Sequence, residues 1–512
     1  MQNGTLLAAV DLGSNSYRLE IGRFDRGQIN RTEYLKETVR QGNGLDGDRN
    51  LTLVAMQRGW DCLARFGERL SGFKKAQVQA VATQTLREAR NRDEFIARGN
   101  KILGFPINVI SGCEEARLIY QGVAHMLPQS DERRLVVDIG GRSTEMIVGK
   151  GLDARTMESY RVGSVAWSMK FFPEGQFTAR AFASAEIAAK AILDEAVSTY
   201  RAGAWDVAYG SSGTIGAVSD VLSAAGWTPG MVTREGLDWL LDRLIKAQSA
   251  ERLKIDGMKE DRRAVIGGGV SVLRAIFSLL DIQQMQVAVG ALRHGVLYDL
   301  LDREQGATDL RSTSVDRLAG KFATDTVQSQ RVSKVARQLF LMVIKQRPDT
   351  QELTPVNDRL LRKLQWAAQL HEVGSHISHS DYHKHGAYIL DHADAPGFAL
   401  SELHRLSQLV LGHRGKLRKL EVDFEDRSFV QQLLCLRIAV ILCHARREPD
   451  LQGLQLELDS EHGRLFVLSY RPGWADAFPQ SAHLLREEAL AWQKTPWTLI
   501  VSERDLQASR FA

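Results

Sequence analysis

The sequence predicts a mixed α/β protein whose first part is internally duplicated and whose later part is mainly helical. Three observations predict this class. A segment that begins at Val10 aligns without a gap on one that begins at Val137, and each holds an apolar strand, an Asp, a Gly/Ser turn and a second apolar strand. Strand-like and helical runs alternate as far as Leu301, which is typical of layered α/β domains. Beyond Leu301 the pattern becomes helical and returns to strands only near the end.

At 512 residues the chain is too long for one hydrophobic core, so several domains are expected. The polar stretch Arg303–Ser314 is interpreted as a linker. The changes in pattern predict four domains: residues 1–125 and 126–302 are α/β, 303–445 are all-helical, and 446–512 form a small α+β C-terminal domain.

The predicted elements follow the periodicity of apolar residues. In the first domain a helix is expected within Leu51–Leu70, and strands are expected at Leu6–Val10, Tyr17–Phe24, Gln28–Val39, Val78–Ala82 and Ile107–Ile110. The second domain restarts at Arg134, with further strands at Met157–Val162 and Trp205–Tyr209, the latter running into a Gly/Ser loop. From Val315 to about Ala445 the pattern is helical, and Leu454–Leu458 and Leu465–Leu468 alternate again.

Composition is that of an ordinary globular protein, with 44% hydrophobic and 25% charged residues. A net charge of +4 does not indicate nucleic-acid binding. The four cysteines are scattered, which favours reduced thiols in a cytosolic protein. No apolar run is long enough to span a bilayer, and the start lacks the basic flank of a signal peptide. We therefore expect a cytoplasmic location, and loose association with the membrane is left open.

The two duplicated turns have the composition of phosphate-binding loops. Small residues expose backbone N–H groups that can surround phosphate oxygens. An Asp precedes each loop and is a hard oxygen ligand suited to Mg²⁺, so Asp11 and Asp138 are candidate metal ligands. The candidate phosphate-binding residues are Gly13, Ser14, Asn15 and Ser16 in the first loop and Gly140, Gly141, Arg142 and Ser143 in the second.

Glu115 is the candidate base, because it follows a strand and a turn at the start of a predicted helix. Hydrolysis of a phosphoanhydride needs a positioned water, a base and cations that offset the developing charge. The alternative is that acidic residues in a first helical turn only complement the helix dipole, which accounts well for Glu114 and partly for Glu115.

Arg18 and Arg87 are candidate cations for the phosphate groups. Arg87 lies at a predicted helix start, where free N–H groups favour anions; the alternative is a surface arginine paired with Glu88 or Glu94. A third strand-to-helix turn is a further phosphate-loop candidate, with a plain helix cap as its alternative. Its residues are Ser212, Gly213 and Thr214.

Histidines concentrate in the helical region, and His371-Glu372 resembles the His-Asp pair of metal-dependent phosphohydrolases with Glu in place of Asp. Adjacent residues on a helix diverge by about 100°, so a degenerate remnant or an anion-binding surface is favoured over a working metal site. Closely spaced cations can hold a polyanion through many salt-sensitive contacts. The predicted polyphosphate channel comprises His379, His383, His413, Arg414, Lys416 and Arg418, and a solvated helix end is its alternative.

Together these motifs resemble the exopolyphosphatase / guanosine pentaphosphate phosphatase family, in its bacterial exopolyphosphatase branch, within the actin-like, sugar-kinase superfamily. The resemblance covers essentially the full length. It is carried by Ala9–Ser16, Thr85–Arg87, Ile110–Ile119, Val137–Gly141, Ser212–Thr214, Gly290–Tyr298 and Leu370–Gly374.

The resemblance implies two actin-like (ribonuclease H-like) ATPase-type α/β domains, a helical domain related to the His-Asp phosphohydrolases, a small C-terminal domain and a homodimer. It also implies that Glu115 is the base, that Asp138 and Glu145 are catalytic or bind Mg²⁺, and that both loops contact phosphate. K⁺ as an activator is left open. Two departures stand out: Arg142 replaces a third loop glycine, and Glu372 indicates lost chemistry in the helical domain.

The expected function is an exopolyphosphatase that releases terminal orthophosphate from inorganic polyphosphate by Mg²⁺-assisted in-line attack of water. The nearest alternative is a guanosine pentaphosphate 5′-phosphohydrolase that uses the same site. A kinase or ATP-driven switch is disfavoured by Glu115, a base placed for water. A non-catalytic sensor that binds polyphosphate or nucleotide is disfavoured by the intact Glu115 and Asp138.

Overall fold

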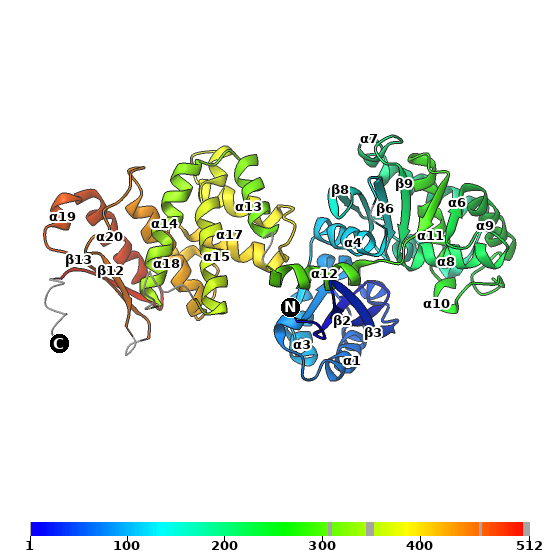
Figure 1. Ribbon diagram of the computed structural model, residues 1–512, viewed down its shortest axis with the longest axis horizontal. Helices are drawn as coiled ribbons and strands as arrows, with labels where there is room; N and C mark the ends of the chain where they lie inside the picture. The colour runs from blue at the N-terminus through cyan, green and yellow to red at the C-terminus, as the bar shows by residue number, and fades with distance from the viewer. Residues whose placement is uncertain (1, 129, 306–309, 345–352, 460–462, 505–512) are drawn as a thin grey trace. The chain divides into compact units, whose positions relative to one another are not determined.

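The computed structural model describes residues 2–128, 130–305, 310–344, 353–459 and 463–504. The chain divides into two compact units, Met1–Asp309 and Leu310–Ala512, and each is described here by itself (Figure 1). Among the described residues, no helix combines the length and the apolar composition that crossing a membrane requires.

The first sheet of unit 1 has five strands in the order β3-β2-β1-β4-β5. Its central strand β1 is buried from Leu7 to Leu12, as expected for a strand covered on both faces. The amphipathic helix α1 starts at a capping Thr52, whose side chain accepts a hydrogen bond from Ala55 N. The elements are β1 Leu6–Leu12, β2 Tyr17–Asp25, β3 Gln28–Glu37, α1 Leu53–Arg69, β4 Val78–Ala82, α2 Gln84–Glu88, α3 Arg92–Leu103, β5 Ile107–Val109 and α4 Gly112–Met126.

The second sheet has six strands in the order β10-β11-β9-β6-β7-β8, and α6, α8, α9 and α11 lie over one of its faces (Figure 1). Its first strands are β6 Arg133–Ile139, β7 Thr144–Lys150 and β8 Asp153–Tyr160. The following elements are α5 Ser164–Phe171, α6 Ala179–Leu193, α7 Ala196–Tyr200, β9 Val207–Ser211, α8 Ser212–Ala224, β10 Met231–Thr233, α9 Arg234–Ala247, α10 Glu260–Arg263, α11 Ile266–Leu279, β11 Gln284–Val287 and α12 Leu292–Gln305.

The two sheets repeat one topology, as the aligned segments predict. Each central strand has an antiparallel hairpin partner on one side and a parallel strand on the other. Asp11 pairs with Arg18 in the first hairpin, and Asp138 pairs with Glu145 at the equivalent register of the second. A shift in the pairing register between the second and third strands, a β-bulge, also recurs. It lies next to Gly22 in one copy and next to Gly149 in the other.

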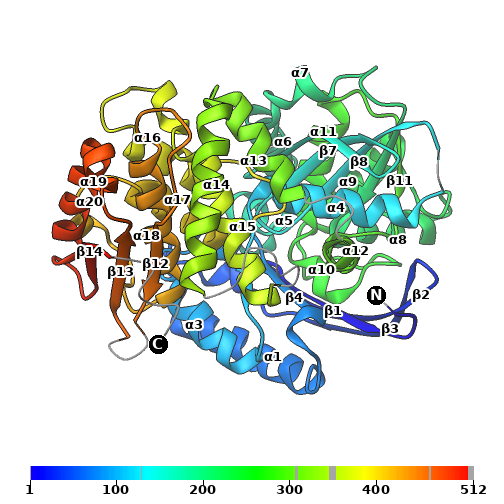
Figure 2. The same ribbon diagram turned by 60° about the vertical axis from the view of Figure 1, so that its left-hand side comes forward.

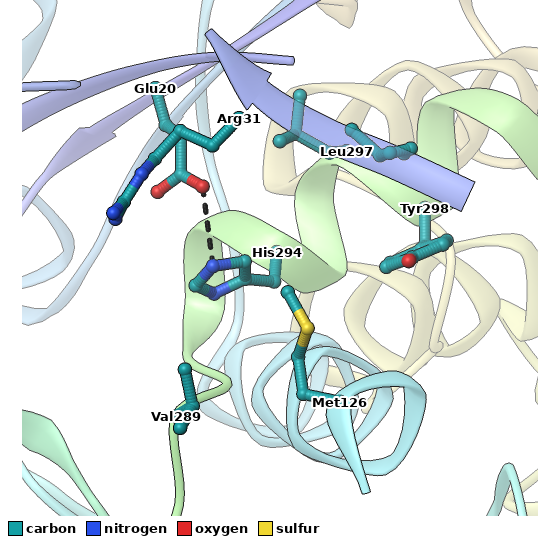
Figure 3. A pocket seen from close by; sticks show the side chains of 8 residues that line it. Glu20, Arg31, Met126, Val289, His294, Leu297 and Tyr298 are labelled. Carbon is teal, nitrogen blue, oxygen red and sulfur yellow. Dashed lines mark ion pairs between the residues drawn. The ribbon is translucent and has the colours of Figure 1, made fainter. Parts of the chain in front are cut away.

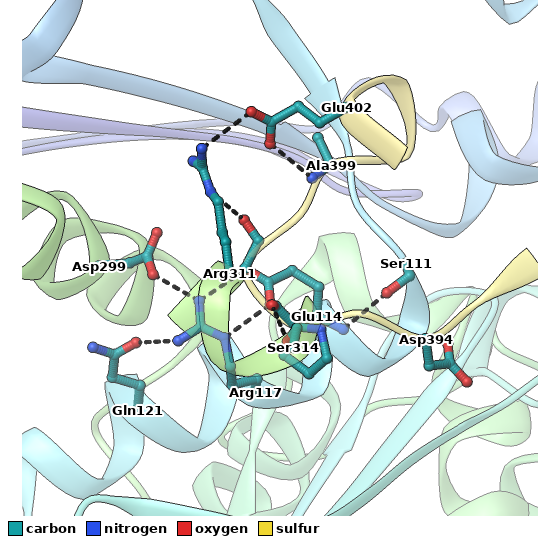
Figure 4. Close-up of polar contacts among 12 residues, drawn as sticks. Ser111, Glu114, Arg117, Gln121, Asp299, Arg311, Ser314, Asp394, Ala399 and Glu402 are labelled. Carbon is teal, nitrogen blue, oxygen red and sulfur yellow. Dashed lines mark hydrogen bonds and ion pairs between the residues drawn. The ribbon is translucent and has the colours of Figure 1, made fainter. Parts of the chain in front are cut away.

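Helices α4 and α12 cross between the two sheets (Figure 1). Glycines permit this crossing, because a Cβ atom on Gly122 would collide with the carbonyl oxygen of Ala291 and one on Gly295 with that of Leu118. Away from these glycines the helices are joined by a buried ion pair, in which the Arg117 guanidinium lies 2.7 Å from a carboxylate oxygen of Asp299 on α12 (Figure 4).

Arg117 also binds residues of its own helix, with two bonds of 2.8 Å to the carboxylate of Glu114 and one of 2.9 Å to Gln121 (Figure 4). Glu114 therefore forms an ion pair within the helix. It also belongs to the first turn of α4, where its N–H donates a hydrogen bond to the side chain of Ser111.

Unit 2 consists of helices and a three-stranded sheet in the order β12-β13-β14 (Figure 2). One apolar core extends through it from Val315 to Leu499, so the helices and the C-terminal strands share their interior. Its elements are α13 Leu310–Lys321, α14 Thr326–Val343, α15 Pro355–Leu370, α16 Tyr382–His392, α17 Leu400–Gly412, α18 Arg427–Leu442, β12 Gln455–Leu458, β13 Leu465–Tyr470, α19 Trp474–Ala477, α20 Pro479–Trp492 and β14 Thr498–Glu503.

The predicted strands of the first domain, its helix and the helical region are all found, with small shifts at their ends. The predicted linker Arg303–Ser314 is wrong at both ends, because α12 continues to Gln305 and α13 begins at Leu310; its residues 306–309 lie outside the described part of the chain. The predicted Gly/Ser loop Gly210–Thr214 is wrong as a separate element, because β9 continues to Ser211 and α8 begins directly at Ser212.

Candidate active site

The two duplicated loops lie against each other. A Cβ atom placed on Gly141 would lie 3.0 Å from the Cβ of Ser14 and 3.7 Å from the backbone nitrogen of Asn15. The Ser14 hydroxyl accepts a 2.7 Å hydrogen bond from Thr85, and its carbonyl accepts one of 2.7 Å from the N–H of Gly42. These bonds hold the first loop in place, so both sets of loop N–H groups border the same space.

Four carboxylates, one from each of β1, α4, β6 and β7, influence one another at these loops. Burial raises the pKa of Glu115 to about 7, and the charges of Asp11 and Asp138 raise it further against the lowering effect of Arg87. Burial likewise raises the pKa of Asp138 to about 6, although Ser211 and Arg18 lower it. The pKa of Glu145 is raised well above its usual range, first by burial and then by Glu115. Burial is thus the main reason that the ionised forms of these carboxylates are disfavoured, and repulsion between the carboxylates adds to it.

Glu115 is 7% exposed and lies in the first turn of α4, which begins after the capping residue Ser111. Its Oε2 lies 2.9 Å from the Arg87 guanidinium and, apart from this ion pair, has no hydrogen-bond partner among the described residues. Arg87 is fixed by a 2.8 Å bond to the Ile110 carbonyl and by bonds to Gln84. The alternative in which Arg87 pairs with Glu88 or Glu94 is thus wrong, because its ion pair is made with Glu115.

Glu145 lies on β7 opposite Asp138. The Ser159 hydroxyl donates a 2.8 Å hydrogen bond to Glu145 Oε1. Ser159 in turn packs where a Cβ atom of Gly112 would be, so the glycine lets β8 approach the start of α4 closely. Reasoning from residue types alone misses Glu145, although the duplicated register would find it, because Arg18 holds the same place in the first hairpin.

The donor set fits Mg²⁺, which binds through one or two carboxylates together with phosphate oxygens and water. Among the described residues, no three His, Cys, Asp or Glu side chains are arranged to hold a metal by themselves. A cation next to Asp138 would stabilise the ionised carboxylates, whose pKa values are raised first by burial and then by their mutual repulsion.

Arg18 lies 3.2 Å from Asp11 and neutralises it, so the first hairpin carries a cation where the second carries Glu145.

Arg142 turns from the second loop toward the first half of unit 1. Its guanidinium lies 2.9 Å from Glu88, and it donates a 3.2 Å hydrogen bond to the carbonyl of Gly42. Arg142 therefore connects the two halves of the unit beside both loops.

The third turn contributes a cation that the sequence reasoning missed. The guanidinium of Arg262 lies where a Cβ atom of Gly213 would be, directly on the Ser212–Thr214 turn. Burial and then the like charge of Arg18 lower the pKa of Arg262, and its nearest acid, Asp261, is 3.9 Å away. No sequence signal marks this residue, because the run Lys259–Arg263 has the composition of a solvated surface segment.

The side chains of the third turn itself support the backbone. Ser212 has a φ of 92° and its hydroxyl accepts a hydrogen bond from Thr214 N, while the Thr214 hydroxyl donates a 3.0 Å bond to the carbonyl of Ile139 at the end of β6. The turn is thereby tied to the second loop.

A cavity of about 230 Å³ lies between the first sheet and α12 (Figure 3). At its polar end Glu20 accepts from His294 Nε2 at 3.2 Å and from Arg293 Nε at 3.1 Å. The backbone N–H of Ala291 donates to His294 Nδ1, which leaves the ring proton on Nε2. The other lining residues are Ile29, Arg31, Met126, Val289, Leu297 and Tyr298.

In unit 2 the imidazoles of His371 and His413 lie with their centroids 5.3 Å apart. Each Nδ1 bonds a backbone carbonyl, and burial lowers the pKa of both rings. Glu372, the second member of the His-Asp-like pair, forms a 2.7 Å ion pair with Arg446.

Because His413 is 2% exposed, it does not belong to the exposed basic surface predicted for it. His383 is half-buried, whereas four of the predicted channel residues are exposed: His379, Arg414, Lys416 and Arg418.

Comparison with known proteins gives a consistent result. A model of the Ppx/GppA phosphatase family matches residues 21–304, and one of Ppx/GppA phosphatase, domain III, matches residues 310–489. A guanosine-5′-triphosphate,3′-diphosphate pyrophosphatase of Vibrio vulnificus is 36% identical over 504 residues, which is 98% of this chain and 99% of that protein. One of Pseudoalteromonas translucida is 37% identical over 498 residues, or 97% of this chain and 98% of that protein.

Among solved structures, an exopolyphosphatase from Cytophaga hutchinsonii matches with a TM-score of 0.53 at 24% identity, covering 58% of this chain and 98% of that one. An Aquifex aeolicus member of the Ppx/GppA family matches with a TM-score of 0.50 at 24% identity, covering 59% and 99%. These likenesses show the fold, which is actin-like. The chain belongs to the Ppx/GppA phosphatase family and is a phosphoanhydride hydrolase.

Proposed function

We propose that the enzyme removes the 5′-terminal phosphate of guanosine pentaphosphate (guanosine 5′-triphosphate 3′-diphosphate) and releases orthophosphate. This reverses the order of the two substrates expected from the sequence. The observation that carries the substrate is the full-length similarity to two proteins named for that activity, at 36% and 37% identity. The observation that carries the reaction is Glu115, a buried base beside two phosphate loops.

In the proposed reaction a water molecule attacks the terminal phosphorus in line with the bridging oxygen. Glu115 Oε2 accepts the water proton; its pKa of about 7 suits a base that works near neutral pH. The new P–O bond forms as the bridging P–O bond breaks, and the electron pair remains on the inner phosphate. Arg87 holds Glu115 in position, while the loop N–H groups, Arg18 and Arg262 offset charge on the phosphoryl oxygens.

Mg²⁺ would be held by Asp138 and Glu145, with Asp11 on the opposite loop, and would supply charge neutralisation when bound. The Ser159 bond orients Glu145 for this role. Asp11 is the weaker ligand candidate of the three, because Arg18 already pairs with it.

Inorganic polyphosphate is the second candidate substrate. The exposed cations Arg414, Lys416 and Arg418 favour it, because a polymer with many equivalent charges can bind several of them at once. His413 is not part of this argument, since it is buried. Homodimer formation and activation by K⁺ stay predictions.

The deciding experiment measures phosphate release from guanosine pentaphosphate and from long-chain polyphosphate, with Mg²⁺, over a series of salt concentrations. A higher kcat/KM for the nucleotide supports the proposal, and a strong preference for the polymer contradicts it. Binding of the polymer should weaken more steeply with salt than binding of the nucleotide. In a variant with Arg414, Lys416 and Arg418 changed to Gln, only the salt dependence for the polymer should become shallower.

A further inference from the structure

Tyr34 is an aromatic side chain on the edge strand β3 that the proposed reaction does not use. It is 39% exposed. In the sheet it stands opposite Glu20, while Lys36 stands opposite Arg18 and Arg18 opposite Asp11. Directly paired residues share a face, so Tyr34 lies on the same face as the Arg18–Asp11 row. It is displaced from that row by two residues, which is about 7 Å along the strand.

Cations surround the Tyr34 ring. The guanidinium of Arg293 lies 5.0 Å from the ring centroid and that of Arg31 lies 5.6 Å away, both within the range of cation–π contacts. Tyr34 also influences the pKa of Arg18, after burial and Asp11, and that of Arg262, after burial, Arg18 and Asp261. Tyr34 is therefore a flat, partly exposed ring two residues along the sheet from the Arg18–Asp11 row.

The surrounding arginines differ in how firmly they are held. Glu20 is bound by His294 (Figure 3). It also binds Arg293 at 3.1 Å, so Arg293 is a fixed support for the ring. The side chain of Arg31 has no hydrogen-bonded or ionic partner among the described residues, and it is exposed. Arg31 can therefore move aside or bind an anion when a ligand approaches the ring.

Arg262 has no close carboxylate partner among the described residues. Asp261 lies 3.9 Å from Arg262 but pairs with Lys36 at 2.8 Å. Arg262 thus keeps most of its charge free for an anion. The Tyr34 ring thus has one guanidinium held by Glu20, that of Arg293, and one without a hydrogen-bonded or ionic partner among the described residues, that of Arg31. A partly exposed aromatic ring with guanidinium groups beside it can bind the base and the phosphates of a nucleotide.

We propose that Tyr34 stacks against the guanine base of the nucleotide substrate and so distinguishes it from inorganic polyphosphate. This inference rests on the proposed function and names a specificity-determining residue for it. Inorganic polyphosphate has the same phosphoanhydride but no ring to place on Tyr34. The contact therefore lowers the KM for the nucleotide without affecting the chemistry at the terminal phosphate, because the base is remote from the reacting bond.

The test compares wild type with Tyr34→Ala and Tyr34→Phe on two ligands. Phosphate release gives KM and kcat for guanosine pentaphosphate and for tripolyphosphate, and calorimetry gives the Kd of guanosine tetraphosphate, which needs no turnover. For Tyr34→Ala we expect the nucleotide KM and the tetraphosphate Kd to rise on the order of 10-fold, the usual size of a lost base–aromatic stack. The kcat for guanosine pentaphosphate, and both KM and kcat for tripolyphosphate, should stay within about twofold of the wild-type values. Tyr34→Phe retains the ring and behaves as wild type.

Tyr388→Ala is the matched control, because Tyr388 is a more exposed tyrosine, 64% accessible, on α16 of unit 2. It should change none of these constants. An equal loss on nucleotide and tripolyphosphate would overturn the proposal, since Tyr34 would then act by supporting Arg293. A loss in Tyr34→Phe as large as in Tyr34→Ala would assign the effect to the hydroxyl and also overturn it.

The experiment distinguishes a failure of the proposed function from a failure of the stacking role of Tyr34. If wild type does not cleave guanosine pentaphosphate, the proposed function fails, and the calorimetric Kd of guanosine tetraphosphate still decides the role of Tyr34. A weaker Kd in Tyr34→Ala supports stacking. An unchanged Kd, or no binding to wild type, overturns it.

Discussion

The first and second hairpins of unit 1 have the same backbone and opposite charge. Both place an Asp at the end of a central strand, and both carry a bulge at the equivalent glycine. Across from Asp11 stands Arg18, whereas across from Asp138 stands Glu145. The backbone geometry that makes a phosphate loop is therefore common to both, and the side chain opposite the Asp decides which ion each loop attracts.

The difference appears in the electrostatics of the two aspartates. Arg18 lies 3.2 Å from Asp11 and compensates it. Asp138 faces a second carboxylate instead, and burial raises its pKa to about 6. We interpret the first hairpin as the side that holds phosphate oxygens and the second as the side that holds the cation.

The largest effect is expected for Glu115→Gln, which tests whether the site between the hairpins performs hydrolysis. Removing a general base typically lowers kcat by about 10²- to 10⁴-fold. The KM should change little, because the loops and Arg18 remain. Steady-state phosphate release measures both constants, and thermal unfolding shows whether the variant is folded. A folded variant with wild-type kcat would remove Glu115 from the mechanism.

The next comparison separates the two hairpins directly. Glu145→Gln should raise the Mg²⁺ concentration for half-maximal activity by about 10- to 100-fold, because it removes an acidic group from the cation side. Arg18→Gln should raise the KM of the substrate and leave the Mg²⁺ requirement unchanged. Titrations of Mg²⁺ at saturating substrate, and of substrate at saturating Mg²⁺, give the two quantities. If both variants shift both quantities together, the division of labour is wrong.

The raised pKa of Asp138 should also make the free energy of unfolding depend on pH. The folded pKa of Asp138, about 6, lies above its ordinary value of 3.8. A carboxyl with a raised pKa stabilises the fold when protonated, so this contribution is complete below pH 3.8 and is lost as the pH rises through about 6. Asp138→Asn removes the charge, and the metal-free variant should therefore melt several degrees above wild type at pH 8.

At pH 4 the melting temperatures of Asp138→Asn and wild type should converge, since the wild-type carboxyl is then protonated in the fold. Adding Mg²⁺ at pH 8 should raise the melting temperature of wild type more than that of the variant. Thermal unfolding followed by circular dichroism at the two pH values measures these differences. A variant less stable than wild type at pH 8 would show that the charge of Asp138 is compensated after all.

The smallest effect is expected at Arg142, the residue that replaces a loop glycine. Its ion pair with Glu88 is partly exposed, and such pairs contribute about 0–1 kcal/mol. Arg142→Gly should therefore change the substrate KM by a few-fold at most, whereas Glu88→Gln breaks the same pair and leaves the loop intact. If only Arg142→Gly changes the KM, Arg142 binds phosphate; if both do so equally, the bridge between the halves is what matters. An unchanged KM in both makes Arg142 a bystander.

The duplication could be read from the sequence because the two segments align residue by residue, and the loops and Asp residues then follow from local chemistry. Strand pairing is also why Glu145 could have been found without a family comparison. Arg262 and Tyr34 could not be predicted from the sequence, because each comes close to the loops only when distant segments of the chain fold together. Local reasoning leaves two interpretations of Arg87, a phosphate-binding cation or a surface arginine paired with Glu88 or Glu94, and only the tertiary contact with Glu115 excludes the second. The prediction that His413 belongs to an exposed basic surface is wrong, because a basic run in the sequence does not reveal that one of its residues is buried.

The repeated bulge at Gly22 and Gly149 has an evolutionary consequence. An irregularity kept at the same register in both halves indicates that the two hairpins are copies of one unit. Two identical copies would present the same side chain opposite each Asp and could not attract different ions. The difference between Arg18 and Glu145 is therefore what makes the repeated backbone an asymmetric site.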